Sequence, residues 1–106
     1  MLQEEDKLGE GGQVTPQFDW DAANRYHLGR NHVIPEEAQH AIRDPHAVLL
    51  AMESDSGGER TKALGKTASG RVLAVVFTIR GEVIRPITAY LAAPHLETLY
   101  LRARRI

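Results

Sequence analysis

The spacing of hydrophobic and polar residues divides the chain into a helical first half and a β-rich second half. Asp21 is suited to cap a helix over residues 22–31, because its side chain can accept a hydrogen bond from an N–H group of the first turn. Pro35, followed by two glutamates, predicts a second helix over residues 35–43, since proline fits the first turn and carboxylates suit its positive dipole end. Two short consecutive helices are therefore expected.

A strand pattern begins after a turn at Asp44-Pro45 and a short apolar run. Three strands are predicted, over residues 59–66, 71–80 and 83–90, and the short links between them indicate an antiparallel meander. The nearly continuous apolar sequence VLAVVFTI places the second strand in the middle of the sheet, with both faces covered. Pro86 predicts an edge position or a bulge in the last strand, because proline donates no backbone hydrogen bond.

A final helix is expected to begin at Pro94 and to end near several arginines. Its apolar stripe consists of Leu96, Leu99, Tyr100 and Ala103. The predicted fold class is therefore α+β, with two N-terminal helices, an antiparallel β-sheet meander and a C-terminal helix.

Composition and charge separate residues 1–16 from the rest of the chain. This segment contains three glycines, a proline and four carboxylates against one lysine, a net charge of −3, so we expect a flexible leader. Residues 17–106 are expected to form a single domain, because a chain of this length builds only one core. Residues 59–106 carry nine Lys and Arg against three Glu, a net charge of +6, which favours an anionic partner such as nucleic acid or an acidic protein.

Several classes of protein and site are disfavoured by the residues that are missing. The chain has no cysteine, which excludes disulfides and thiolate metal sites. No apolar run approaches the roughly 20 residues that span a bilayer, and the N-terminus lacks the features of a signal peptide, so we expect a cytoplasmic protein without a membrane partner. His27 and His32 are five residues apart, off the spacing of paired helical ligands, so no metal and no cofactor are expected.

The first predicted helix carries an unusual density of polar side chains. Asn24, His27 and Asn31 share one stripe of this helix, whereas Ala23 and Tyr26 are expected to turn toward the core. The stripe is suited to bind or react with a ligand. The alternative is that these side chains are plain surface polarity or form hydrogen bonds to a neighbouring loop.

The segment GERTK, residues 58–62, is a second candidate for chemistry. In a strand Arg60 and Lys62 point to the same side, opposite to Glu59, so the two cations could hold a phosphate group. The alternative is a solvated outer face on which Glu59 pairs with an arginine of the next strand.

An ordered series of short motifs resembles the BrnT family of toxins, which are small ribonucleases of type II toxin–antitoxin pairs related in fold to the RelE group. The resemblance extends from Phe18 to about Tyr100 and covers nearly the whole domain. Its most specific part is Trp-Asp-x-x-Asn-x-x-His at residues 20–27, followed by His32, Pro-Glu-Glu-Ala at 35–38, Asp-Pro at 44–45, Leu-Gly-x-Thr at 64–67 and Gly-Arg at 70–71. The resemblance implies a compact fold that cleaves RNA and is held by a small antitoxin of the ribbon-helix-helix type.

Cleavage of RNA without a metal needs a base for the 2′-hydroxyl, an acid for the departing 5′-oxygen and cations for the phosphate. Histidine suits the proton-transfer roles, because its ordinary pKa of about 6.5 lies near neutrality. The candidate proton carriers are His27, with Glu59 and His32 as alternatives, and the candidate phosphate ligands are Arg60, Arg71 and Arg85. Further candidates for contact with RNA are Trp20, Asn24, Lys62 and Tyr90. For Trp20 the sequence leaves two interpretations, a platform for stacking bases or an anchor in the core.

Two positions depart from the pattern that the resemblance implies. Similar family members usually carry an arginine where this chain has Tyr90, and others carry a lysine where it has Asn24. The leading hypothesis is a toxin-like, metal-independent ribonuclease neutralised by an antitoxin. The alternative is a domain of the same fold that has lost cleavage and binds protein or RNA in a regulatory complex. The sequence leaves open whether the chain also forms a homo-oligomer.

Overall fold

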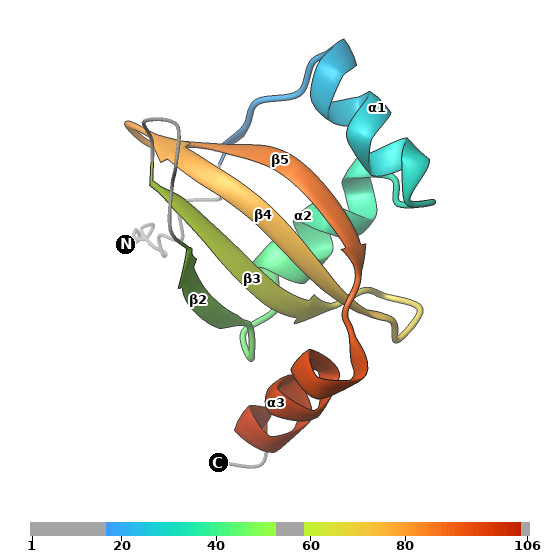
Figure 1. Ribbon diagram of the computed structural model, residues 1–106. Helices are drawn as coiled ribbons and strands as arrows, with labels where there is room; N and C mark the ends of the chain where they lie inside the picture. The colour runs from blue at the N-terminus through green and yellow to red at the C-terminus, as the bar shows by residue number, and fades with distance from the viewer. Residues whose placement is uncertain (1–16, 53–58, 105–106) are drawn as a thin grey trace, which may run out of the picture.

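The computed structural model describes residues 17–52 and 59–104, which form three helices and a five-stranded sheet (Figure 1). The predicted leader, residues 1–16, lies outside the described residues. The elements in chain order are β1 (Gln17–Phe18), α1 (Ala22–Arg30), α2 (Pro35–Arg43), β2 (Val48–Met52), β3 (Arg60–Lys66), β4 (Val72–Arg80), β5 (Val83–Leu91) and α3 (Pro94–Arg104). The predicted α+β class is confirmed, as are two N-terminal helices and one C-terminal helix.

The strand order is β1-β5-β4-β3-β2, which places the apolar strand β4 at the centre as predicted. Strands β2 to β5 pair antiparallel, and β1 adds a short parallel pair with β5, so the whole sheet is mixed. The apolar run before the loop forms β2, an edge strand that the sequence pattern did not assign. The register shifts between β4 and β5 where Phe77 pairs with Pro86 and Val76 pairs with Thr88, which confirms the predicted bulge.

Two hydrophobic clusters lie on opposite faces of the sheet. The first lies under α1 and α2 and contains Leu28, Val33, Ala38, Ala41, Leu73, Val75 and Ala89. The second lies on the α3 side and contains Leu64, Val72, Ala74, Ala92 and Tyr100. Figure 1 shows α2 behind the sheet, α1 beside the upper part of β5, and α3 beyond the lower end of the sheet. Among the helices of residues 17–52 and 59–104, none lies over the upper part of the face opposite α2.

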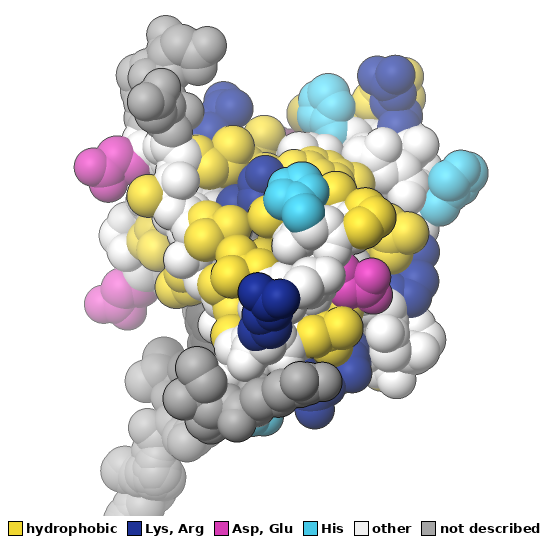
Figure 2. Space-filling view, turned by 60° about the horizontal axis from the view of Figure 1, so that its bottom comes forward, with side chains coloured by type: hydrophobic (Ala, Val, Ile, Leu, Met, Phe, Trp, Pro, Cys, Tyr) yellow, Lys and Arg dark blue, Asp and Glu magenta, His cyan; other side chains and the backbone are white. Residues whose placement is uncertain are grey.

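The C-terminal helix contacts the sheet less fully than its sequence predicts. Tyr100 is buried and Leu96 packs against the second cluster, but Leu99 and Ala103 of the predicted apolar stripe are exposed. The stripe is only half covered because α3 packs against the end of the sheet rather than across it. Figure 2, which turns this end toward the viewer, shows hydrophobic side chains (yellow) at the surface with cationic side chains among them. Within residues 17–52 and 59–104, no helix is long and apolar enough to cross a membrane.

Candidate active site

The start of α1 is fastened to β5 through the amide of Asn24, a side chain only 2% exposed. Its Nδ2 donates to the carbonyl oxygens of Asp19, at 2.8 Å, and of Pro86, at 2.9 Å, while its Oδ1 accepts from the N–H of Asp21 at 2.8 Å. The side chain of Asp21 caps α1 in return by accepting from the N–H of Asn24, as predicted. Asn24 thus forms buried hydrogen bonds that join the start of α1 to the bulge of β5.

This arrangement corrects the predicted orientation of α1. Asn24 and Leu28 face inward, whereas Ala23 and Tyr26, which were expected to turn toward the core, are exposed. The hydrogen bond from Asn24 to Pro86 explains the difference, because it draws that side of the helix onto the polar backbone exposed by the bulge. The interpretation of Asn24 as a hydrogen-bonding residue to a neighbouring segment is therefore confirmed.

Arg85 forms a second connection between β5 and the segment that precedes α1. Its guanidinium lies 2.9 Å from Oδ2 of Asp21 and 3.1 Å from Oδ2 of Asp19. The hydrogen bond to Asp21 is the largest influence that raises the pKa of Arg85, and Asp19 adds to it. The pKa of Asp21 is lowered, first by the hydrogen bond from the Asn24 N–H and then by Arg85. Two carboxylates thus more than balance the charge of this arginine.

A pocket of about 260 Å³ opens beside this junction, and we call it the α1 pocket. It is lined by Ala23, Asn24, His27, Arg60, Thr78, Arg80, Arg85 and Ile87. The lining residues come from α1 and from the adjoining ends of β3, β4 and β5. The fold therefore brings together four of the candidate residues identified in the sequence, namely Asn24, His27, Arg60 and Arg85.

The polar residues of the α1 pocket differ in how they are engaged. Arg85 is held by its two carboxylates, whereas the side chains of His27, Arg60 and Arg80 form no hydrogen bond or ion pair with another residue in 17–52 or 59–104. Two cations and an imidazole therefore face one small volume. This combination can bind a phosphate group and transfer a proton beside it.

Arg71 and His32, also candidates from the sequence, lie elsewhere. Arg71 donates to Glu37 at 3.0 Å and to the carbonyl oxygen of His32 at 3.4 Å, near the start of β4. Arg80 of the α1 pocket ends the same strand, nine positions further along the chain, which corresponds to about 30 Å of extended backbone. Neither Arg71 nor His32 lines the α1 pocket.

Three other candidates do not line the pocket. Glu59 has an exposed side chain, and its carbonyl oxygen accepts from the hydroxyl of Thr78 at 3.0 Å. Lys62 and Tyr90 lie together on the sheet, with the ammonium 5.8 Å from the ring centroid. Both side chains are half-buried.

Trp20 packs against the first hydrophobic cluster, and its Nε1 donates to Oε1 of Gln39 at 2.7 Å. The guanidinium of Arg25 lies over the same ring, 5.8 Å from its centroid. These contacts agree with the interpretation of Trp20 as a core anchor that joins the start of α1 to α2.

Arg80 and Thr78 are pocket residues that the sequence interpretation missed. The signal was present in the tight turn at Gly81-Glu82, which sets Arg80 opposite Val83 and hence Thr78 opposite Arg85. Counting back from that turn would have placed Arg80 and Thr78 beside the candidate Arg85. Gly81 has φ of +62°, a left-handed conformation that glycine adopts without strain.

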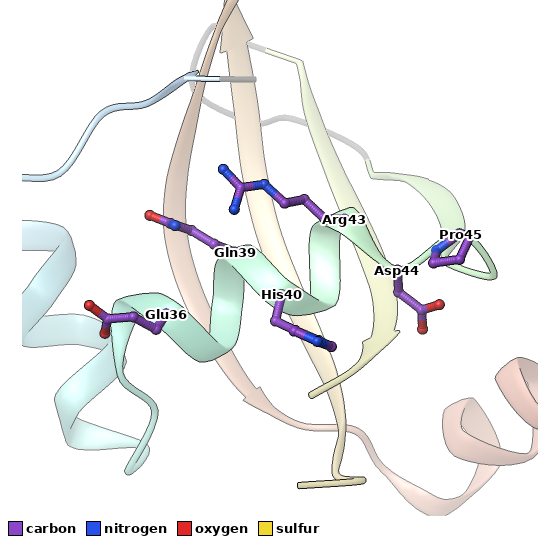
Figure 3. A pocket seen from close by; sticks show the side chains of 6 residues that line it. All are labelled: Glu36, Gln39, His40, Arg43, Asp44 and Pro45. Atoms are coloured by element: carbon purple, nitrogen blue, oxygen red, sulfur yellow. The ribbon is translucent and has the colours of Figure 1, made fainter. Parts of the chain in front are cut away.

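A second pocket, of about 330 Å³, runs along α2 and serves as a contrast (Figure 3). We call it the α2 pocket; its lining consists of Glu36, Gln39, His40, Arg43, Asp44 and Pro45. Gln39 accepts from Trp20, and Nδ1 of His40 lies 2.9 Å from the carbonyl oxygen of Lys66. In Figure 3 the side chains of Gln39 and Arg43 extend from the same side of α2, and Arg43 lies 5.1 Å from the ring centroid of Phe18.

Asp44 closes the α2 pocket and is the most engaged carboxylate of the two pockets. It accepts from the backbone N–H groups of His46 and Lys66, both at 2.9 Å, and from the hydroxyl of Tyr100. Burial tends to raise the pKa of Asp44, but these hydrogen bonds outweigh burial and lower it. Asp44 is therefore a structural residue that joins α2, β3 and α3.

Comparison with known proteins assigns the chain to a family. Among residues 17–52 and 59–104, no group of three His, Cys, Asp or Glu residues is placed to hold a metal ion. Among curated proteins, none matches the chain in sequence. A family model described as the ribonuclease toxin BrnT of type II toxin–antitoxin systems matches residues 20–95, a span that includes every residue lining the α1 pocket. The chain therefore belongs to the BrnT family of ribonuclease toxins.

Proposed function

We propose that this protein cleaves RNA in the α1 pocket without a metal ion and that a small antitoxin of the ribbon-helix-helix type neutralises it. The observation that carries the proposal is the convergence of His27, Arg60 and Arg80 on one pocket. Family membership implies an RNA substrate and an antitoxin partner. We place the activity in the cytoplasm, where RNA and the antitoxin are made.

In the proposed reaction, His27 accepts the proton of a 2′-hydroxyl as its oxygen attacks the adjacent phosphorus. The bond from phosphorus to the 5′-oxygen breaks, which leaves a 2′,3′-cyclic phosphate and a 5′-hydroxyl. The departing 5′-oxygen takes its proton from solvent, to which the pocket is open. Arg60 and Arg80 stabilise the charge that grows on the phosphate, which is the part that a metal ion plays in other nucleases.

Arg85 and Asn24 have positioning roles in this proposal. Arg85 is already balanced by Asp19 and Asp21, so it is a poor ligand for a further anion but a firm connection between β5 and α1. Asn24 fixes the first turn of the helix that carries His27. Together they hold the imidazole on one side of the pocket, facing the cations of β3 and β4.

A second candidate function is binding of RNA or protein without cleavage. It is favoured by the pairing of Arg85 with two carboxylates and by Tyr90, which stands where similar family members usually carry an arginine. Both features lower the number of cations that can act on the phosphate. Where the partner is RNA, the two functions use the same binding surface and differ only in whether the RNA is cut.

Cleavage of single-stranded RNA by the purified protein in EDTA tests the proposal. The changes His27→Ala and Arg60→Ala should each lower the rate, by about 10² to 10⁴-fold for a proton carrier and about 10² to 10³-fold for an electrostatic donor. The controls His95→Ala and Arg30→Ala remove an exposed histidine and an exposed arginine outside the pocket and should leave the rate unchanged.

Thermal unfolding should show that all four variants remain folded, because exposed substitutions usually change stability by only about 0.5 kcal/mol. Loss of cleavage in EDTA, or equal cleavage by the wild type and both pocket variants, would overturn the mechanism. Binding of RNA with no cleavage by the wild type would establish the second candidate in its place.

A further inference from the structure

The sheet face opposite α2 carries an aromatic ring and a cation that the proposed reaction does not use. Tyr90 of β5 pairs with Ala74 of β4, and Lys62 of β3 pairs with Val76. The ammonium of Lys62 lies 5.8 Å from the centroid of the Tyr90 ring, across the small side chains of the central strand. The two residues therefore form one feature of the sheet surface, although they come from strands on either side of β4.

This feature is continuous with the α1 pocket. Arg60 lines the pocket, and Lys62 follows it by two residues on β3, so their side chains share one face about 7 Å apart. Thr78 and Arg80 have the same parity as Val76 on β4 and lie on that face as well. A chain of phosphates that enters the pocket at Arg60 can therefore follow β3 to Lys62.

The side chain of Tyr90 is packed against the protein on one side and partly exposed to solvent. Its ring packs against the second hydrophobic cluster, to which Leu64, Ala74 and Tyr100 belong, yet the side chain remains partly exposed. A ring that is fixed on one side and partly open on the other is the arrangement in which aromatic side chains stack on nucleobases.

We propose that Tyr90 and Lys62 form a nucleobase subsite, in which the ring stacks on an unpaired base of the RNA and the ammonium binds the adjoining phosphate. The inference rests on the proposed function and adds the substrate class, which is single-stranded RNA. In an RNA duplex the faces of the bases are already stacked on one another, so Tyr90 could not reach them. At the position where similar family members usually carry an arginine, this chain thus has no cation but an aromatic ring that can stack on a base.

A set of single-stranded RNA hexanucleotides with 2′-O-methyl groups, which cannot be cleaved through the 2′-oxygen, tests the subsite by equilibrium binding. Each hexanucleotide of the set lacks the base at one position. The wild-type protein should bind one of them about 5- to 150-fold more weakly than the intact oligonucleotide, the range that one stacked base contributes. It should also bind the intact single strand more tightly than the duplex of the same sequence.

Variants then assign the effect to the ring. Tyr90→Leu, which keeps an apolar side chain on the cluster, should weaken binding of the intact oligonucleotide by the same 5- to 150-fold factor and should cause no further loss with the oligonucleotide that lacks the critical base. Tyr90→Phe keeps the ring and should bind like the wild type. Lys62→Gln should weaken all oligonucleotides of the set equally and reduce the dependence of binding on salt.

Equal binding of every base-deleted oligonucleotide by the wild type would overturn the subsite without any variant being needed. Additive losses from Tyr90→Leu and the missing base would also overturn it. Cleavage that depends on His27 together with either of these results would leave the proposed function standing and remove only the subsite. Binding that depends on Tyr90 without any cleavage would leave the subsite standing and remove the nuclease.

Discussion

The α1 pocket and the α2 pocket are similar in size and both contain arginine, histidine and aspartate or amide side chains, but they use them in opposite ways. In the α2 pocket, Gln39, His40 and Asp44 each have hydrogen-bonding partners within the protein. In the α1 pocket, the side chains of His27, Arg60 and Arg80 have none among the described residues. Asn24, Thr78 and Arg85, which also line the α1 pocket, have internal partners and in this respect resemble the residues of the α2 pocket.

The difference teaches which polar groups are structural in a small domain. A buried or half-buried polar group costs free energy unless it is paired, so the groups that join elements are the ones with internal partners. Asp44 joins three elements and Arg85 joins β5 to the start of α1. Groups that face solvent without partners are the ones that can exchange water for a ligand.

The largest expected effect on stability comes from disturbing the contact between α2 and β3 beneath the α2 pocket. A Cβ atom added at Gly65 would lie 1.9 Å from the carbonyl oxygen of Ala41, so Gly65→Ala would force the last turn of α2 away from β3. We expect a loss of about 3 kcal/mol or more in the free energy of unfolding, at the upper end for overpacking against a backbone atom. Denaturant unfolding measures the change.

Gly29→Ala is the matched control for this substitution. A Cβ added at Gly29, which is inside α1, would meet no atom within 4 Å apart from its chain neighbours and the backbone of its own helix. Alanine there should raise stability by about 0.5 to 1 kcal/mol, because it favours the helix over the unfolded chain. Equal effects of the two substitutions would show that α2 does not lie on β3 as closely as described.

The hydrogen bond from Tyr100 to Asp44 provides a smaller effect with a dependence on pH. Burial is the main reason that the pKa of Tyr100 is raised, and the bond to Asp44 adds to it, bringing the pKa to about 12. Since the pKa in the folded state exceeds the ordinary value of 10.0, the contribution to stability is complete below pH 10 and is lost as the pH rises through 12. Tyr100→Phe should therefore lower stability by about 1 to 2 kcal/mol at neutral pH.

Unfolding free energies of the wild type and Tyr100→Phe, measured between pH 8 and 12, check this prediction. The two curves should converge at the alkaline end, because the phenylalanine variant has no hydroxyl to ionise. Tyr26→Phe, which changes an exposed tyrosine, should follow the wild type throughout. Parallel curves for Tyr100→Phe would mean that the hydroxyl contributes nothing through Asp44.

The elements that the sequence predicted well are those with strong local signals. The cap at Asp21 and the proline at position 35 gave the starts of α1 and α2, and the apolar run of β4 gave its central place. Of the two strands that were missed, β2 pairs with the next strand along the chain, whereas β1 is set by a contact distant in sequence. The two residues of β1 pair with β5 across 66 positions of chain, and no local pattern specifies that pairing.

The grouping of the candidate residues in space was predicted in part, for a related physical reason. Sequence alone identified His27, Arg60 and Arg85 as candidates, and the fold brings them to one pocket. It grouped Arg71 with them because charge and motif carry no information on which end of a strand a side chain occupies. Arg71 instead pairs with Glu37 at the far end of β4.

The smallest expected effect concerns His32, which the sequence suggested as a proton carrier and which lies outside the α1 pocket. Its φ of +61° is left-handed, the conformation of the residue that follows a helix in a Schellman motif. The N–H of Val33 donates to the carbonyl oxygen of Leu28 and that of His32 to Gly29, which completes the motif. Glycine is favoured at this position because a side chain there costs about 1 to 2 kcal/mol.

His32→Gly should therefore raise the free energy of unfolding by about 1 kcal/mol and leave RNA cleavage unchanged. Denaturant unfolding measures the first effect and the cleavage assay in EDTA measures the second. His32→Ala is the control, since it removes the imidazole but keeps the Cβ atom, and it should change neither quantity. If both variants lost cleavage, His32 would belong to the site. The α1 pocket alone would then not account for the reaction. If only His32→Gly gained stability while both variants cleaved normally, the residue would be assigned to the helix end alone, where its backbone conformation and not its imidazole matters.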